Sequence, residues 1–216
     1  MNRDQVLKNM IDCGVVAVLR AKSSSELLDV SKALYDGGVT SIEVTMTTPG
    51  ALKVIEEVAS KMSGQVIVGV GSVLDPETAR AAILAGAEFV VGPVLKEAVI
   101  EMAKRYSKVV IPGAFTPTEI LCAWEAGADV VKVFPATAMG PKYFRDILGP
   151  LPQVRLSPTG GVTVENTGEF IKAGAVFVGA GTSLVDSKAV AEKRLGVITD
   201  TAKRMVAEVR KARGAE

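Results

Sequence analysis

The 216-residue chain contains no histidine. This absence excludes Ser-His-Asp and Cys-His nucleophilic catalysis, histidine-ligated metal sites and acid–base catalysis by an imidazole ring. Proton transfer in this protein must therefore use lysine, aspartate, glutamate, tyrosine or cysteine. The clustered acids that hold catalytic metals are not recognisable either, so we expect neither a metal nor another cofactor.

Cysteine and long hydrophobic runs are also scarce. Cys13 and Cys122 lie far apart in sequence and form no CxxC motif. This spacing favours buried, reduced thiols over a disulfide or a metal site. No apolar run reaches the ~18 residues of a membrane span, and the polar start, residues 1–5, is unlike a secretory signal. We therefore expect a cytoplasmic protein.

The chain has no excess of one charge. Its 25 basic and 24 acidic residues give a net charge of +1 and are interspersed. Without a basic stripe, nucleic acid is an unexpected partner, and no feature indicates a membrane. The hydrophobic fraction of 48% is that of an ordinary globular chain. At about 150 residues per domain, the length predicts one domain spanning residues 1–216.

Short β-branched runs alternate with longer amphipathic segments, the pattern of successive β/α units. Strands are predicted at residues 15–19, 41–46, 66–70, 88–91, 109–111, 130–134, 154–157 and 176–179. Helices are predicted at residues 24–36, 49–61, 76–85, 96–106, 118–126 and 164–173. Pro49 and Pro76 fit first-turn positions, where a missing N–H costs nothing.

Four of these helices end in a small residue, glycine and then alanine or valine, at residues 36–39, 84–87, 125–128 and 172–175. Such a sequence is a C-cap leading into the next strand. Eight strands and units of ~25 residues predict a single-domain (β/α)8 barrel, to which we add a short N-terminal helix. Catalytic side chains of such barrels lie at the C-terminal ends of the strands.

Lys132 lies in the apolar strand predicted at residues 130–134. Apolar neighbours remove water from an ammonium group and favour the neutral amine, which attacks ketones to form a Schiff base. Two alternatives stay open: the lysine ends a strand and reaches solvent, or it pairs with an acid.

Glu43 follows a strict alternation in which Ser41, Glu43, Thr45 and Thr47 share one side of a strand. A buried carboxylate without a partner is very costly, and Lys132 is the obvious partner. Glu43 is therefore either a structural ion-pair partner or a general acid/base beside an amine nucleophile.

Arg20 and two glycine-rich turns, residues 158–162 and 179–184, follow predicted strands. A guanidinium at the end of a strand suits a carboxylate or a phosphate, although Arg20 could equally be a surface residue. Glycines let backbone N–H groups approach an anion, and barrel enzymes often bind phosphate after the seventh and eighth strands. Alternatively, the glycines only serve tight turns.

With these residues in place, the chain resembles the 2-keto-3-deoxy-6-phosphogluconate (KDPG) aldolases, including the bifunctional enzymes that also cleave 4-hydroxy-2-oxoglutarate (KHG). The resemblance extends from about Val15 to Leu184. It rests on the segments Ile42-Glu43-Val44-Thr45, Val68-Gly69-Val70-Gly71-Ser72-Val73, Ile111-Pro112-Gly113, Thr116-Pro117-Thr118-Glu119, Lys132-Val133-Phe134-Pro135-Ala136 and Pro158-Thr159-Gly160-Gly161.

The resemblance implies a metal-independent class I aldolase, commonly trimeric, that cleaves a phosphorylated keto acid to pyruvate and glyceraldehyde 3-phosphate. Lys132 matches the Schiff-base lysine and Glu43 the general acid/base. The substrate-binding matches are, at the phosphate, Thr159, Gly160, Gly161, Gly181 and Thr182; near the pyruvyl end, Arg20 and Ser72; and elsewhere along the substrate, Thr47, Pro93 and Phe134.

The chain also departs from the family pattern. Some members carry arginine after Glu-Val-Thr, where this chain reads Met46-Thr47-Thr48. Ser72 stands where many members have threonine, Gly92 and Thr182 where others have serine. Alternative functions are therefore an aldolase for 2-keto-3-deoxy-6-phosphogalactonate, a phosphate-binding barrel isomerase or synthase, and a non-catalytic phosphosugar sensor.

Overall fold

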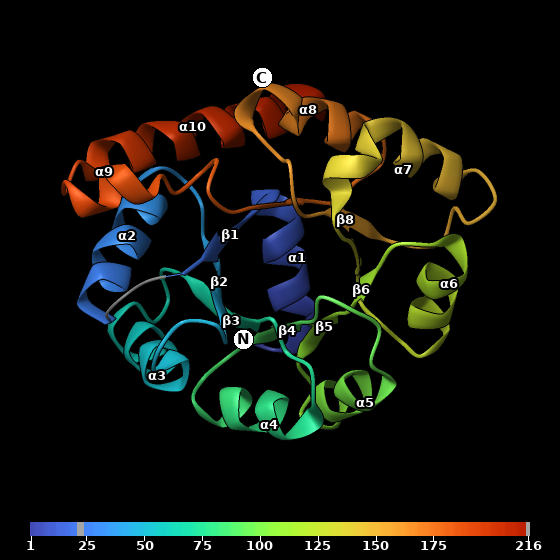
Figure 1. Cartoon of the computed structure of the whole chain (residues 1–216), viewed down its shortest axis with the longest axis horizontal. Coiled ribbons are helices and arrows are strands. Elements are labelled where there is room, and N and C mark those ends of the chain that lie inside the picture. Colours follow the sequence, from blue (N-terminus) through green and yellow to red (C-terminus); the bar gives the residue numbers. More distant parts are fainter. Residues whose placement is uncertain (21–23, 215–216) are drawn as a thin grey trace.

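The computed structural model describes residues 1–20 and 24–214, in which parallel strands and helices alternate and the strands curl into a barrel (Figure 1). The strands are β1 (Val15–Leu19), β2 (Ser41–Thr45), β3 (Ile67–Gly71), β4 (Phe89–Val91), β5 (Val109–Ile111), β6 (Gly113–Ala114), β7 (Val131–Val133), β8 (Leu156–Pro158) and β9 (Val178–Ala180). One sheet has the order β5-β4-β3-β2-β1-β9 and the other β6-β7-β8. Bridges from Leu156 to Ala175 and from Thr159 to Gly179 join the two sheets and close the barrel.

β5 and β6 occupy one strand position, interrupted at Pro112. Proline has no N–H for a strand ladder, but the Pro112 carbonyl accepts a hydrogen bond from the Lys132 amide at 2.9 Å. In the described part of the chain, the strands thus fill eight positions of a parallel barrel. The predicted (β/α)8 fold is confirmed, with strand ends displaced by a residue or two.

The helices are α1 (Arg3–Cys13), α2 (Ser24–Asp36), α3 (Ala51–Lys61), α4 (Pro76–Leu84), α5 (Glu97–Arg105), α6 (Pro117–Glu125), α7 (Gly140–Leu148), α8 (Val164–Lys172), α9 (Ser187–Ala191) and α10 (Leu195–Ala212), with a 3-10 turn, η1 (Ala136–Ala138). Those from α2 to α8, and α10, surround the barrel (Figure 1). The four predicted C-cap segments contain Gly38, Gly86, Gly127 and Gly174, which all have positive φ.

Two expectations about helices are wrong or incomplete. Pro49 precedes α3 rather than lying in its first turn, because Gly50 at the N-cap has a left-handed φ of 67°. The helices α7, α9 and α10 are missing from the sequence prediction. α7 begins with the pair Gly140-Pro141, which is typical of turns, and neither α9 nor α10 leads into a further strand.

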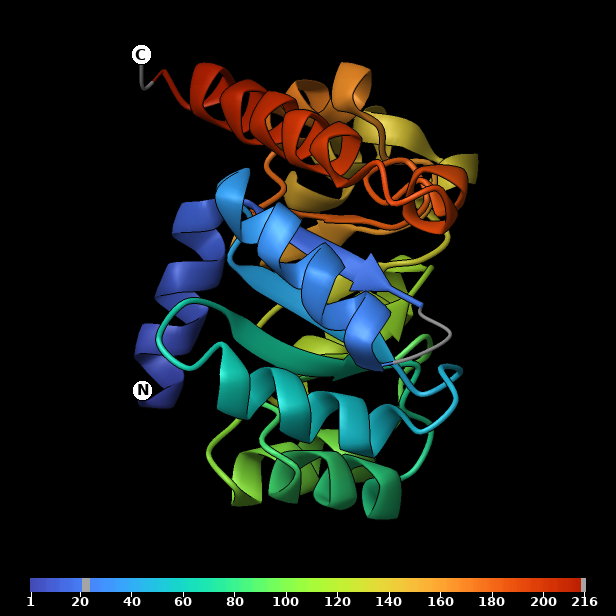
Figure 2. The same ribbon diagram turned by 90° about the vertical axis from the view of Figure 1, so that its left-hand side faces the viewer.

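The N-terminal helix α1 covers the end of the barrel at which the strands begin (Figure 2). Val6 and Met10 are fully buried and pack with interior side chains such as Val16 and Phe89. Arg213, just after α10, donates hydrogen bonds to the carbonyls of Ile11, Asp12 and Val176 at 2.7, 3.1 and 2.8 Å. The bonds to Ile11 and Asp12 satisfy carbonyls of the last turn of α1, which have no partner within that helix.

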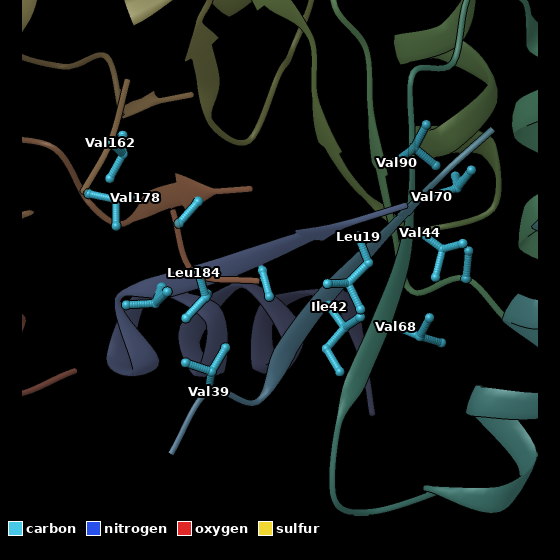
Figure 3. Packing of buried hydrophobic residues seen from close by; sticks show 14 of the residues in the cluster. Leu19, Val39, Ile42, Val44, Val68, Val70, Val90, Val162, Val178 and Leu184 are labelled. Carbon is cyan, nitrogen blue, oxygen red and sulfur yellow. The ribbon is translucent and has the colours of Figure 1, made fainter. Parts of the chain in front are cut away.

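The hydrophobic core has two layers. The outer layer lies between strands and helices and includes Ile42, Val44, Val68 and Val70 (Figure 3). The inner layer fills the barrel interior next to α1 and includes Phe89, whose ring occupies the space beside Gly69 on β3. Packing of this kind closes the N-terminal end of the barrel and leaves the chemistry to the C-terminal ends of the strands.

Both cysteines are free thiols, as expected, but Cys122 is exposed on α6 and Cys13 is partly buried. The expectation that both are buried is therefore wrong, because the position of Cys122 on α6 faces solvent rather than the core. Across the described residues, the helices are too short or too polar for any of them to cross a membrane.

Candidate active site

Lys132 is the middle residue of β7, and its side chain is 6% exposed. Its neighbours Val131 and Val133 belong to the outer core layer, so Lys132 takes the inner face of the strand. The strand register pairs Lys132 with Gly113 of β6 and Ser157 of β8. The lysine of the predicted Schiff base is thus held among strands rather than reaching freely into solvent.

Glu43 is the middle residue of β2 and is 3% exposed. The predicted alternation is confirmed, since Ile42 and Val44 are fully buried in the outer layer while Glu43 takes the inner face. Its carboxyl group lies over Gly71 of β3, where an added Cβ would come within 2.5 Å of the carboxyl carbon. Glycine at position 71 therefore leaves the space that the Glu43 carboxyl occupies.

Burial raises the pKa of Glu43 above its ordinary value of 4.5, and the positive charges of Lys132 and Arg20 oppose this shift. The ion pairs found within 4.0 Å among the described residues do not include Glu43 with Lys132. Lys132 is therefore close enough to act on Glu43 through its charge without a direct ion pair.

A small cavity lies between these side chains inside the barrel. Its volume is about 10 Å³, and Glu43, Lys132, Ser157 and Thr159 contribute its polar lining. A cavity of this size is about as large as one water molecule. A larger groove, about 840 Å³, lies beside α1 at the opposite end of the barrel and contains neither Lys132 nor Glu43.

Three further predicted substrate-binding residues, Arg20, Thr47 and Ser72, lie in loops after the strands. Arg20 directly follows β1 and is exposed. Thr47 is exposed, and its hydroxyl lies 2.9 Å from that of Thr45. Ser72 follows β3 with a φ of 59°, a left-handed conformation that is costly for a residue with a side chain.

Pro93 and Phe134 follow β4 and β7. The backbone of Pro93 packs closely on Gly113, and a Cβ at position 113 would collide with the Pro93 carbonyl group. The Phe134 ring is 37% exposed, and its centre lies 4.9 Å from Nζ of Lys132. Phe134 is therefore next to the amine at the open side of the site.

The glycine-rich segment after β8, residues 159–163, forms what we term the β8 turn. The Thr159 amide donates a hydrogen bond to the Val133 carbonyl at 3.1 Å. The Thr159 carbonyl accepts one from the Ala136 amide at 2.9 Å. These bonds attach the turn to the strand that carries Lys132. Gly160 and Gly161 have φ values of 93° and 71°, and Thr137 of η1 lies against both.

The segment after β9, residues 181–183, is the β9 turn. The Gly181 carbonyl accepts hydrogen bonds from the amides of Leu184 and Val185 at 3.0 and 2.9 Å. Thr182 is exposed, and the hydroxyl of Ser183 donates to the Val162 carbonyl at 2.5 Å. The two turns that the sequence nominated for an anion are thus joined directly.

Sequence reasoning did not single out three side chains, Thr137 and Asn166 beside these turns and Ser183 within the nominated segment 179–184. Asn166 accepts from the Thr163 amide and donates to the Gly161 carbonyl, each at 2.8 Å. The three-residue spacing of Thr163 and Asn166 at the start of a helix is a capping signal that could have identified this residue. No comparable local signal marks Thr137. Among the described residues, histidine, cysteine, aspartate and glutamate nowhere form a group of three that could hold a metal ion.

Comparison with known proteins places these features in a family. The family model for KDPG and KHG aldolase matches residues 6–201. The KHG/KDPG aldolase of Escherichia coli (strain K12) is 34% identical over 193 residues, which are 89% of this chain and 90% of that protein. The 2-dehydro-3-deoxy-6-phosphogalactonate aldolase of the same strain is 33% identical over 171 residues, or 79% of this chain and 83% of that protein.

Solved structures show the same relationship. The KDPG aldolase from Legionella pneumophila, captured with pyruvate as a covalent carbinolamine intermediate, matches with a TM-score of 0.84 and 27% identity, covering 91% of this chain and 97% of that one. A 3-hexulose-6-phosphate synthase, with a TM-score of 0.73 at 20% identity over 91% of this chain and 99% of that one, shares the fold alone. The match over residues 6–201 shows that the chain is an aldolase that belongs to the KDPG and KHG aldolase family.

Proposed function

We propose that this aldolase cleaves KDPG to pyruvate and glyceraldehyde 3-phosphate through an imine on Lys132, and that it also accepts KHG, which would give pyruvate and glyoxylate. The observation that carries the proposal is the placement of Lys132 and Glu43 on inner faces of β7 and β2, lining one small cavity. An amine nucleophile beside a buried carboxyl is the arrangement that Schiff-base chemistry requires.

The first half of the reaction joins the substrate to Lys132. The neutral amine attacks the ketone carbon to give a carbinolamine, which loses water to form the protonated imine. Glu43, directly or through a water molecule, carries the protons that this dehydration needs. Because burial raises the pKa of Glu43, this carboxyl can hold a proton and release it closer to neutral pH than an exposed glutamate could.

The second half breaks the bond between C3 and C4. Ionised Glu43 takes the proton of the C4 hydroxyl, the C4 carbonyl forms, and the electron pair of the broken bond moves into the imine to give an enamine. Protonation of the enamine at C3 and hydrolysis of the imine release pyruvate and restore the amine. Arg20 and Ser72 would hold the pyruvyl carboxylate, while Thr47, Pro93 and Phe134 would shape the rest of the site.

The substrate phosphate would bind at the β8 and β9 turns, through Thr159, Gly160, Gly161, Gly181 and Thr182. The positive φ values of Gly160 and Gly161 turn the backbone sharply at this point, and α8 begins directly after the turn. Backbone amides and the N-terminus of a helix attract an anion without a cationic side chain.

Gly161→Val is expected to lose most of kcat/KM for KDPG, at least about tenfold, because remote phosphate binding helps to position the reacting carbons. A side chain at position 161 would be strained at φ 71°, and its Cβ would lie 3.0 Å from the Thr137 hydroxyl. Borohydride trapping of pyruvate should continue. Steady-state kinetics with KDPG and KHG measure the effect, and equal losses on both substrates in a folded variant would show that the turn is only structural.

The galactonate epimer is the second candidate substrate, favoured by the 33% identity to a 2-dehydro-3-deoxy-6-phosphogalactonate aldolase. The two phosphorylated substrates differ in the configuration of one hydroxyl. Measurement of kcat/KM for KDPG, its galactonate epimer and KHG, each with and without EDTA, tests the proposal. We expect the highest value for KDPG and no effect of EDTA. A higher kcat/KM for the epimer would show that the epimer, and not KDPG, is the preferred substrate. Activity that is lost with EDTA and restored only by added metal would contradict class I chemistry.

The resemblance also supports a homotrimer as the assembly and the cytoplasm as the compartment. The exposed side chains of Leu74 and Val94 follow the neighbouring strands β3 and β4 and offer apolar surface that a subunit interface could cover.

A further inference from the structure

Asn166, in the first turn of α8, uses both ends of its side-chain amide to tie the helix to the β8 turn. Its Oδ1 accepts a hydrogen bond from the Thr163 amide, and its Nδ2 donates one to the Gly161 carbonyl, each at 2.8 Å. A carboxamide, which only asparagine and glutamine carry, combines an acceptor oxygen with a separate donor nitrogen.

These contacts fix the orientation of two successive peptide planes. Within one planar trans peptide, the carbonyl and the following N–H point in opposite directions. Holding the Gly161 carbonyl toward Asn166 therefore directs the Val162 N–H away from it. The next plane is held at both ends, by Ser183 at the Val162 carbonyl and by Asn166 at the Thr163 N–H.

The glycines make such a restraint necessary. Gly160 and Gly161 adopt φ values of 93° and 71°, and a glycine pair samples many other conformations when nothing holds it. A turn whose amides must converge on an anion loses affinity when it has to be ordered on binding. The side chain that orders the turn beforehand therefore contributes to binding without touching the ligand.

We propose that Asn166 is a positioning residue of the phosphate site: it sets the direction of the backbone amides of the β8 turn that receive the substrate phosphate. The inference rests on the proposed function, since it takes that turn as the phosphate site. Asn166 acts through the donor bond to Gly161, and the acceptor bond to Thr163 serves the start of α8.

Asn166→Asp separates these two roles. An aspartate keeps an acceptor for the Thr163 amide and is favourable in the first turn of a helix, so a residue that serves only the helix would tolerate it. It cannot donate to the Gly161 carbonyl, and it adds a negative charge beside the phosphate site. We expect at least about a tenfold loss of kcat/KM for KDPG, carried mainly by a higher KM, with an unchanged melting temperature.

Asn2→Ala is the matched control, because Asn2 caps α1 through the Gln5 amide at 2.8 Å and lies at the opposite end of the barrel. It should lower the melting temperature and leave the KM for KDPG unchanged. Asn166→Ala removes both hydrogen bonds without adding a charge, and it should also raise the KM for KDPG. It also serves as the test variant if the aspartate variant does not fold. Unchanged KM in folded Asn166→Ala would overturn the inference even if Asn166→Asp raises the KM, because the added charge alone can repel the phosphate.

Pyruvate has no phosphate, so the rate at which borohydride traps it does not depend on the phosphate site. This rate therefore distinguishes a failure of the role of Asn166 from a failure of the proposed function. Trapping in the Asn166 variants should equal that of the wild type. A wild-type protein that traps no pyruvate would contradict the Schiff-base chemistry itself, whereas normal trapping with unchanged KM in the variants would contradict only the role of Asn166. Trapping that falls in parallel with kcat/KM would show a general structural defect and also overturn the inference.

Discussion

Lys132→Met is expected to reduce kcat for KDPG cleavage by about 10⁴-fold or more, because the variant has no amine to form the imine. Methionine is unbranched and apolar, so it suits a buried position and removes a charge from the barrel interior. The removed charge also favours ionised Glu43, so the variant should stay folded with a melting temperature at neutral pH that does not exceed that of the wild type. Steady-state kinetics and thermal unfolding of the purified variant measure both quantities.

Lys142→Met is the control for this substitution, because Lys142 is an exposed lysine on α7. It should keep wild-type kinetics. If the Lys132 variant is folded and retains kcat within about tenfold of the wild type, the reaction does not pass through an imine at this residue.

Glu43→Gln is expected to lower kcat by about 10²-fold or more, since glutamine fills the same space but cannot carry protons. The variant should still form the pyruvate adduct, although more slowly. A folded variant with near-normal kcat would show that Glu43 is a structural partner of the lysine, the alternative that the sequence left open. The substituted glutamine would then merely preserve the packing over Gly71.

The pH dependence of stability provides a second readout for Glu43. Its pKa in the folded protein is raised above 4.5 by burial, so the folded state keeps the proton over a range in which the unfolded chain has lost it. The stability due to this proton is complete below pH 4.5 and is lost as the pH rises through the folded pKa. Glu43→Gln removes this dependence, so the variant should equal or exceed wild-type stability at neutral pH.

The alternation of residues explains why the two central side chains could be predicted. Ile42 and Val44 require burial against the helices, and this fixes the inward direction of Glu43; Val131 and Val133 do the same for Lys132. The fold followed from the same pattern, because short apolar runs and glycine C-caps recur along the chain. Periodicity within one strand thus determines on which side its polar residue lies.

Contacts between distant segments could not be predicted in this way. The burial of Val6 and Met10 under the barrel depends on how eight strands close, and no local pattern reports it. The same holds for Arg213, which reaches carbonyls of Ile11 and Asp12 about two hundred positions earlier in the chain. Side-chain amides and hydroxyls that hold a turn, such as Asn166, have bonding partners that only the three-dimensional structure reveals.

Mass spectrometry after borohydride reduction in the presence of pyruvate tests the central claim most directly, because it reports both the chemistry and its location. The account predicts one reduced pyruvyl adduct per chain, located on Lys132 by peptide mapping and absent from Lys132→Met. An adduct on another lysine, or no adduct in a protein that cleaves KDPG, would contradict it.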